Sequence, residues 1–304
     1  MSAIKPISRL SLSQAEHIWN TLALQNNAPM PMLSFEWYKA WIMVNSMWEP
    51  YILFIDETAI APFVRKGTTV QFTHGYTDFN DLINPSVRVW SRVIDYLRSE
   101  NIQNIELENI PHTSESIHFF QHLASKDVQQ LNILPAKTAP FIDLPQNFED
   151  YISTIKVKRK KYNKFKREYP KALITTSTNL EKDLGKIIEL MRLDSNKEMN
   201  PIKENFFKLI TDVCRKYVWI QLLHIDTEII AGLYLFVHNA KVMFYISGYD
   251  KNKYPNIGTY LTIETIKQSI EKGYKEFSFL KGREPYKYEF GAKDFILYSI
   301  QYRL

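Results

Sequence analysis

The residues best suited to chemistry lie in one stretch of the chain, residues 241–291. Residues 241–247 alternate as in a β-strand, and after Pro255 the apolar spacing becomes helical, until Gly273. Gly258 therefore stands at the entrance of a helix that follows a strand. The first N–H groups of a helix have no partners within it, and its dipole favours negative charge. This turn is therefore a candidate anion site.

A loop crowded with charge and tyrosine, GREPYKYEFG, follows a second predicted strand over residues 275–280. Two simpler interpretations compete with a chemical role for this loop. Arg283 and Glu284 could form only a local ion pair, which contributes little if it is exposed. Residues 286–290 could also be an alternating strand, with Tyr286 packed inward and Lys287 pointing outward.

Composition limits the classes of protein to consider. A chain of 304 residues is long enough for two domains of about 150 residues each. The net charge of +5 permits an anionic ligand but does not indicate DNA binding. The single cysteine excludes an internal disulfide and fits a reducing compartment, and the longest apolar run, IIAGLYLFV, is too short for a transmembrane segment. We expect a cytoplasmic protein.

Strands and helices alternate along the chain in two similar series. The fold class expected is α/β (α+β), with two tandem domains over residues 1–145 and 146–304, each a mixed, mostly antiparallel sheet flanked by helices. In the first half we predict helices over residues 11–24, 34–44, 87–97 and 114–124, and strands over 51–56, 60–66, 69–73, 102–107 and 139–144. In the second half we predict helices over 181–193 and 202–216, strands over 172–177, 219–225, 229–238 and 241–247, and a closing strand over 295–302.

Two polar features of the first half are candidates for binding. In the loop HGYTDFND, Asp78 and Asp81 could orient an amine or a hydroxyl of a substrate, or could instead cap their own turn. His118 and His122 have the i, i+4 spacing of a metal site, but no glutamate motif or cysteine supports them. We therefore expect no metal.

The most basic segment is KVKRKKYNKFKREY, which carries eight Lys/Arg between Lys156 and Arg167. Its apolar residues fit one stripe of a helix predicted over residues 150–169. Three interpretations remain open: a solvated face, a surface for phosphates of a nucleotide-like cofactor or a glycolipid, and an RNA-binding surface.

Several of these motifs together resemble the GNAT superfamily of acyl-CoA-dependent N-acyltransferases. The sequence is most similar to the tandem-GNAT CelD/BcsL-like acetyltransferases of cellulose and polysaccharide biosynthesis, which are related to the Fem-type peptidoglycan aminoacyltransferases. The segments that carry the resemblance are SFEWYKAW, APFVRKG, YTDFNDLI, the basic helix after FIDLP, and YISGYD…YPNIGTYL…EFSFLKGREPYKYEFGA.

The resemblance implies acetyl-CoA or another acyl-CoA as co-substrate. In GNAT domains the central strand splays from its neighbour and pairs with the pantetheine arm, and the pyrophosphate lies at the next helix N-terminus. The positions that correspond here are Tyr245, Ser247, Asn256, Gly258 and Thr259. The usual turn has arginine or glutamine and more than one glycine, whereas PNIGTY offers one glycine and a threonine.

The resemblance also implies roles for the loop. Glu284 would orient or deprotonate the amine, and Tyr286 or Tyr245 would protonate the departing thiolate. Lys287 stands where Fem-type enzymes carry a charge-stabilising lysine in an FKxxFG-like motif, although Tyr286 replaces its phenylalanine. Arg283, with Asp78 and Asp81, would contact the acceptor.

Three functions follow as hypotheses. The first is acyl-CoA-dependent N-acylation of a small-molecule amine, on a sugar or nucleotide-sugar, in surface-polysaccharide biosynthesis. The second is aminoacyl transfer from tRNA to a cell-wall precursor, which is disfavoured because residues 181–217 have room for two ordinary helices and no long arm. The third is a GNAT-like binding module without catalysis, supported by the single glycine of the turn.

Overall fold

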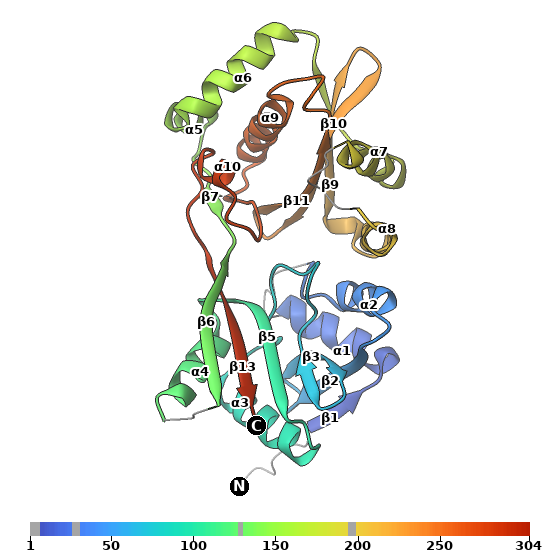
Figure 1. Cartoon of the computed structure of the whole chain (residues 1–304), viewed down its shortest axis with the longest axis vertical. Coiled ribbons are helices and arrows are strands. Elements are labelled where there is room, and N and C mark those ends of the chain that lie inside the picture. Colours follow the sequence, from blue (N-terminus) through green and yellow to red (C-terminus); the bar gives the residue numbers. More distant parts are fainter. Residues whose placement is uncertain (1–6, 26–30, 127–129, 194–198) are drawn as a thin grey trace. The chain divides into compact units, whose positions relative to one another are not determined.

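The computed structural model describes residues 7–25, 31–126, 130–193 and 199–304. The chain divides into two compact units, one of residues 1–138 with 295–304 and the other of residues 139–294. Each unit consists of one sheet with helices (Figure 1). In the described part of the chain, no helix is long and apolar enough to cross a membrane.

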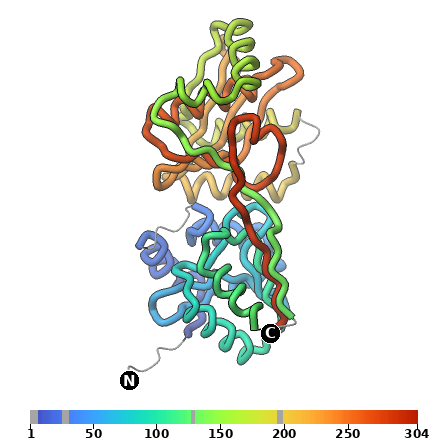
Figure 2. Tube along the Cα trace, turned by 90° about the vertical axis from the view of Figure 1, so that its left-hand side faces the viewer, coloured from blue at the N-terminus to red at the C-terminus, as the bar shows by residue number. Residues whose placement is uncertain are grey.

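The first unit contains a seven-stranded sheet in the order β1-β2-β3-β4-β5-β13-β6. All neighbours are antiparallel except β4 and β5. Figure 2 shows the C-terminal strand β13 running beside β6. The strands are β1 (Ile7–Leu10), β2 (Glu49–Ile55), β3 (Ala59–Lys66), β4 (Thr69–Gln71), β5 (Asn104–Pro111), β6 (Leu131–Thr138) and β13 (Ile296–Arg303), and the helices are α1 (Leu12–Gln25), α2 (Phe35–Val44), α3 (Val87–Ser99) and α4 (Glu115–Ala124).

Serine caps fix where three helices of this unit begin. The hydroxyls of Ser34, Ser86 and Ser114 accept backbone N–H groups at the starts of α2, α3 and α4. Between α3, α4 and the sheet lies an aromatic core in which the fully buried Trp90 contacts Phe120 edge-on, with ring centroids 4.8 Å apart.

The second unit contains a six-stranded sheet in the order β7-β12-β11-β10-β9-β8. Only β11 and β12 run parallel. Helices α5, α6 and α9 lie on one side of the sheet and α7 and α8 on the other (Figure 1). The strands are β7 (Phe141–Asp143), β8 (Leu173–Thr176), β9 (Val218–Ile225), β10 (Glu228–His238), β11 (Lys241–Tyr249) and β12 (Glu276–Ser278), and the helices are α5 (Phe148–Thr154), α6 (Lys156–Glu168), α7 (Leu180–Arg192), α8 (Pro201–Val213), η1 (Arg215–Tyr217), α9 (Ile257–Glu271) and α10 (Pro285–Tyr288).

Glycines allow α7 to pack closely on this sheet. A Cβ atom at Gly248 would lie 2.2 Å from the carbonyl oxygen of Ile187, and one at Gly232 would lie 2.5 Å from the side chain of Ile187. Both distances are shorter than a carbon atom tolerates, so α7 requires glycine at these two strand positions.

The predicted fold class is confirmed, and the differences concern strand partners, breaks and two strands that were not predicted, β1 and β6. The strand predicted to close the first half is β7, which pairs with β12 in the second sheet, and the strand predicted to close the second half is β13, which lies between β5 and β6. The predicted helix 150–169 is broken at Ile155, whose ψ of 60° is not helical. Residues 285–288 form a helix, α10, and the alternating-strand interpretation of this loop is wrong. The domain limits at residue 145 stay a prediction.

Candidate functional site

In the second unit, the sheet opens between β11 and β12. β11 pairs with β10 from Lys241 to Tyr249, with a β-bulge at Tyr245, but pairs with β12 only from Lys241 to Met243. Beyond β12 the chain turns away, since the N–H of Phe279 donates to the carbonyl of Pro140. The ladder between β11 and β12 therefore ends before residues 245–248, where the sequence predicts a splayed strand.

The entrance of α9 follows this open edge. Asn256 precedes the helix with a left-handed φ of 68° and no side-chain cap, and the first turn carries no acidic residue. Among the described residues, the N–H groups of Gly258 and Thr259 have no hydrogen-bond acceptor. Free N–H groups at the positive end of a 15-residue helix suit an anion.

A tyrosine lies against this turn. A Cβ atom at Gly258 would lie 3.0 Å from Cζ of Tyr249, the last residue of β11. The glycine therefore has a packing role as well, because a larger residue would displace the Tyr249 ring. This contact places the C-terminal end of β11 directly beside the candidate anion site.

The loop after β12 is organised by Lys287, which is only 3% exposed. Its Nζ donates to the carbonyls of Leu280, Lys281 and Gly282 at 3.1–3.2 Å, and lies 2.9 Å from the carboxylate of Glu284. An ammonium group has three donors, so these four oxygen atoms occupy all of them. In this conformation Lys287 holds the loop, and it has no donor left for a substrate.

The backbone of the loop fits this arrangement. Leu280 has a φ of 56° and Gly282 a φ of 124°, which turn successive carbonyl groups toward one point. A Cβ atom at Gly282 would lie 2.5 Å from the Glu284 carboxylate, so glycine is needed here for space as well as for conformation.

Tyr286 packs against two phenylalanine rings that flank the loop. Its ring meets those of Phe279 and Phe290 edge-on, at 6.3 and 6.4 Å, and 42% of the residue is exposed. Desolvation, then the negative charge of Glu284 and the neighbouring Tyr249, raise the pKa of Tyr286 above its usual value. The phenol therefore stays protonated at neutral pH. The effect of Tyr249 on this pKa indicates that Tyr286 lies in the neighbourhood of the residue that also contacts Gly258.

The other predicted residues have different surroundings. Asp81 is buried and accepts hydrogen bonds from the hydroxyls of Ser114 and Ser116 and from the N–H of Leu82. Burial raises the pKa of Asp81 to about 6, although these hydrogen bonds oppose the shift. Its oxygen atoms thus anchor the loop to α4. Asp78, which is partly buried, also lies in the first unit.

Arg283 has a different ion partner from the one considered. Its guanidinium lies 3.8 Å from the carboxylate of Asp294 and is largely exposed, whereas Glu284 pairs with Lys287. The interpretation that Arg283 and Glu284 form a local ion pair is therefore wrong, and Arg283 remains accessible to a ligand.

The basic helix α6 is tied to the same loop. Lys158 is 5% exposed; its Nζ lies 3.0 Å from the Glu289 carboxylate and 4.6 Å from the centre of the Phe290 ring. Burial is the main effect on the pKa of Lys158 and lowers it. The hydroxyl of Tyr162 donates to Glu264 of α9 at 2.5 Å. One side of α6 is therefore built into the unit.

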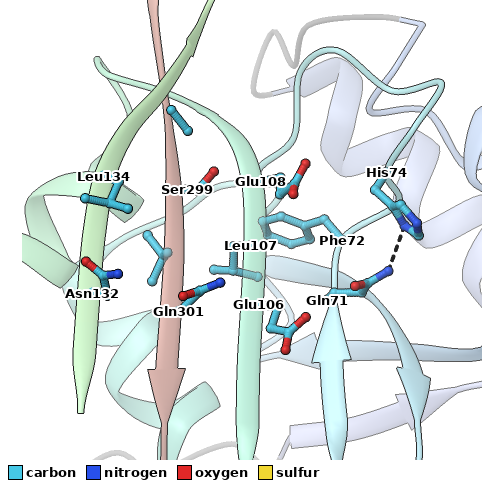
Figure 3. A pocket seen from close by; sticks show the side chains of 12 residues that line it. Gln71, Phe72, His74, Glu106, Leu107, Glu108, Asn132, Leu134, Ser299 and Gln301 are labelled. Atoms are coloured by element: carbon cyan, nitrogen blue, oxygen red, sulfur yellow. Dashed lines mark hydrogen bonds between the residues drawn. The ribbon is translucent and has the colours of Figure 1, made fainter.

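Sequence reasoning missed a pocket of about 270 Å³ on the first unit, which is lined by both polar and apolar residues (Figure 3). It lies along β4, β5, β13 and β6, on one face of the sheet. Glu106 and Glu108 alternate along β5 with the buried Ile105 and Leu107, a pattern visible in the sequence. The pocket also needs β13, whose position beside β5 no sequence pattern reveals. It is lined by Gln71, Phe72, His74, Glu106, Leu107, Glu108, Asn132, Leu134, Ala136, Ser299, Ile300 and Gln301.

Metal ligation receives no support from residues 7–25, 31–126, 130–193 and 199–304, which contain no group of three or more His, Cys, Asp or Glu side chains able to hold an ion. His118 lies 3.5 Å from the Glu115 carboxylate on an exposed helix face.

Solved structures of other proteins share the fold of this chain. The chain is similar in fold to FemX (10% identity, TM-score 0.65, 99% of this chain and 98% of that one). It is also similar to the C-terminal domain of a candidate lysylphosphatidylglycerol synthetase from Agrobacterium fabrum (12% identity, TM-score 0.65, 96% of this chain and 92% of that one). A tandem GNAT protein from the clavulanic acid biosynthesis pathway matches at 8% identity with a TM-score of 0.50, over 97% of each chain.

No curated protein sequence matches the chain. Residues 153–288, from α5 to α10, match the family model described as an acetyltransferase (GNAT) domain, and this match indicates acyl-CoA use in general. The matched segment includes the open edge of β11, the α9 entrance, and Glu284, Tyr286 and Lys287. Residues 153–288 therefore match a GNAT acetyltransferase domain, and this match supports an acyltransferase.

Proposed function

We propose that the protein transfers an acyl group from acetyl-CoA or another acyl-CoA to an amine of a sugar in surface-polysaccharide biosynthesis. The observation that carries this proposal is the end of the β11–β12 ladder at Met243, followed by α9 with free N–H groups at Gly258 and Thr259. Membership of the CelD/BcsL-like group, which suggested the polysaccharide role, and a cytoplasmic location remain parts of the proposal.

The residues of the open edge would hold the co-substrate. Acyl-CoA supplies the activated thioester when it is bound. Backbone groups around Tyr245 and Ser247 would pair with its extended arm, and the turn at Asn256, Gly258 and Thr259 would take the pyrophosphate.

The loop would supply the proton transfers. The amine nitrogen forms a bond to the thioester carbonyl carbon, the C–S bond breaks, the nitrogen loses a proton and the thiolate gains one. Glu284, whose side chain is 54% exposed, would accept the proton from the amine, and the protonated Tyr286 would donate one to the thiolate. Lys287 would keep both side chains in place through its bonds to the loop carbonyls.

The pocket of the first unit has the chemistry of a sugar-binding site. Its carboxylates and amides are hydrogen-bonding groups for hydroxyls and for an ammonium, whereas a phosphate would be repelled by Glu106 and Glu108. Lys137 lies 2.8 Å from Glu108 and neutralises one of the two charges. By itself the pocket therefore favours an amino sugar over a nucleotide-sugar as a ligand.

The second candidate is aminoacyl transfer from an aminoacyl-tRNA to a cell-wall precursor. One feature favours it, the dense positive charge of α6. The regular length of α7 and α8, 13 residues each, disfavours a long helical arm in this unit.

The test is release of free thiol from a panel of CoA esters, with amino sugars and nucleotide-sugars as acceptors. We expect turnover with an amino sugar and protection against thermal unfolding by the matching CoA ester. Protection without turnover on any amine would favour a binding module. Turnover only with charged tRNA would favour the second candidate, and no effect of any CoA ester would refute the proposal.

A further inference from the structure

The positive charge of this protein is concentrated on one helix. α6 carries eight Lys/Arg residues and one glutamate, a net charge of +7 in 13 residues. The whole chain has a net charge of +5, so the rest of the chain sums to −2. Because the positive charge is concentrated on α6, an anionic partner would orient the protein so that α6 faces the partner.

The inner side of α6 belongs to the core of the second unit. Lys158, Tyr162 and Phe165 are buried, and the ring of Phe165 stacks on that of Tyr260 of α9, with centroids 4.7 Å apart. The apolar stripe of this helix is therefore already covered by protein (Figure 1).

The outer side of α6 is a continuous cationic face. Lys156, Lys160, Lys164 and Arg167 are all exposed and follow one another at i, i+4, i+8 and i+11, which places them in one row. The row is about 17 Å long at the helical rise. Arg159 and Lys166 lie beside it and are also exposed.

Most of this charge is not neutralised within the protein. In the described part of the chain, Lys156, Arg159, Lys160 and Arg167 make no ion pair, and Lys164 has only Glu168, at 3.7 Å. Soluble surfaces usually intersperse both signs. A row of uncompensated cations on an otherwise acidic molecule therefore points to an external anion.

We propose that the outer face of α6 docks the protein on an anionic lipid surface. A bilayer surface is flat and needs only one charged face of the protein. Clusters of four to eight Lys/Arg on a helix bind anionic lipids, and each cation raises the affinity about fivefold. Because the apolar stripe is buried, attachment is electrostatic, without insertion of the helix. This inference does not depend on the proposed reaction.

The alternative anionic partner is RNA, which fits this face less well. Single-stranded RNA sites combine cations with aromatic side chains that stack on bases. The aromatic residues of α6, Tyr162 and Phe165, are buried, and the apolar side chain that α6 exposes is Val157. A duplex would need cations over a wider surface, and the rest of the chain is net acidic.

The experiment measures co-sedimentation of the full chain with vesicles of phosphatidylcholine alone and with about one third phosphatidylglycerol. The outer-face variant carries K156Q, R159Q, K160Q and R167Q. The matched control carries K39Q, K126Q, K182Q and R303Q, four exposed cations outside α6 that also lack ion pairs among the described residues. Both variants lose the same net charge. Far-UV circular dichroism and thermal unfolding verify their fold.

We expect binding to the anionic vesicles alone, weakened by roughly 10²- to 10³-fold in the outer-face variant and by less than about tenfold in the control. Binding should also fall as salt is raised from about 0.1 M to about 0.5 M. Equal loss in both variants, no binding to anionic vesicles, or binding to RNA that depends on these four residues in the absence of vesicle binding would each overturn the proposal.

Discussion

The buried carboxyl group of Asp81 predicts how the stability of the first unit depends on pH. Burial raises its pKa from 3.8 to about 6 in the folded protein. The folded state therefore binds this proton more tightly than the unfolded state does. The contribution is fully present below about pH 4 and is lost as the pH rises to about 6.

The magnitude follows from the shift. One pKa unit corresponds to about 1.4 kcal/mol, so the free energy of unfolding should fall by about 3 kcal/mol between pH 4 and pH 7 because of this group. The Asp81→Asn variant has no proton to lose there, and its amide can still accept from one serine hydroxyl and donate to the other. Its stability should therefore lack this part of the pH dependence.

The assay is urea unfolding followed by tryptophan fluorescence, since five of the six tryptophans lie in the first unit. The quantity of interest is the difference in unfolding free energy between wild type and variant at each pH, in which all other titrating groups cancel. Asp95→Asn is the matched control, because the Asp95 carboxylate is 80% exposed on α3 of the same unit. A wild-type minus Asp81→Asn difference that stays constant from pH 4 to pH 7, or that grows in favour of wild type, would refute the assignment.

Three further predictions concern packing, the loop and the pocket. Gly248→Ala should destabilise the second unit by about 1–3 kcal/mol in chemical unfolding, because its Cβ would lie 2.2 Å from the Ile187 carbonyl oxygen. The control Gly185→Ala places its Cβ where no atom lies within 4 Å, and should stabilise the unit by up to about 1 kcal/mol. Lys287→Met should lower kcat at least about tenfold and speed proteolysis within residues 280–284, since four oxygen atoms lose their donor. Slow turnover with unchanged proteolysis would instead indicate that Lys287 takes part directly in catalysis. Glu106→Gln should weaken binding of an amino sugar to the chain about tenfold and leave thermal protection by acyl-CoA unchanged; equal effects on both would argue against the pocket as a sugar site.

Local patterns predicted most helices and most strands because their causes are local. The hydroxyls of Ser34 and Ser114 cap the helices that begin directly after them. The hairpin of β2 and β3 follows from two apolar runs on either side of a short turn. The partners of distant strands have no such signal. The alternation of β13 predicts a strand but is equally compatible with either sheet, and its position between β5 and β6 depends on contacts nearly 200 residues apart.

In the candidate site as well, features with local causes could be predicted from the sequence, and features that depend on tertiary contacts could not. The strand, turn and helix around Gly258 could be predicted because strand and helix periods differ. The environment of Lys287 could not, since its partners are backbone carbonyls that the left-handed Leu280 and the glycine at 282 turn inward. Asp81 likewise carries no sign of burial, because Ser114 and Ser116 reach it from 33 and 35 residues away.

Two buried lysines determine where α10 lies. A helix of four residues is not stable by itself, so its position depends on tertiary contacts. Lys287 binds the loop that precedes α10, and Lys158 reaches from α6 to Glu289 and the Phe290 ring directly after it. Each ammonium group is desolvated and would be costly to bury unless its oxygen partners were held in place. Since Glu284 and Tyr286 lie between these two anchors, their placement depends on α6 as well as on the loop.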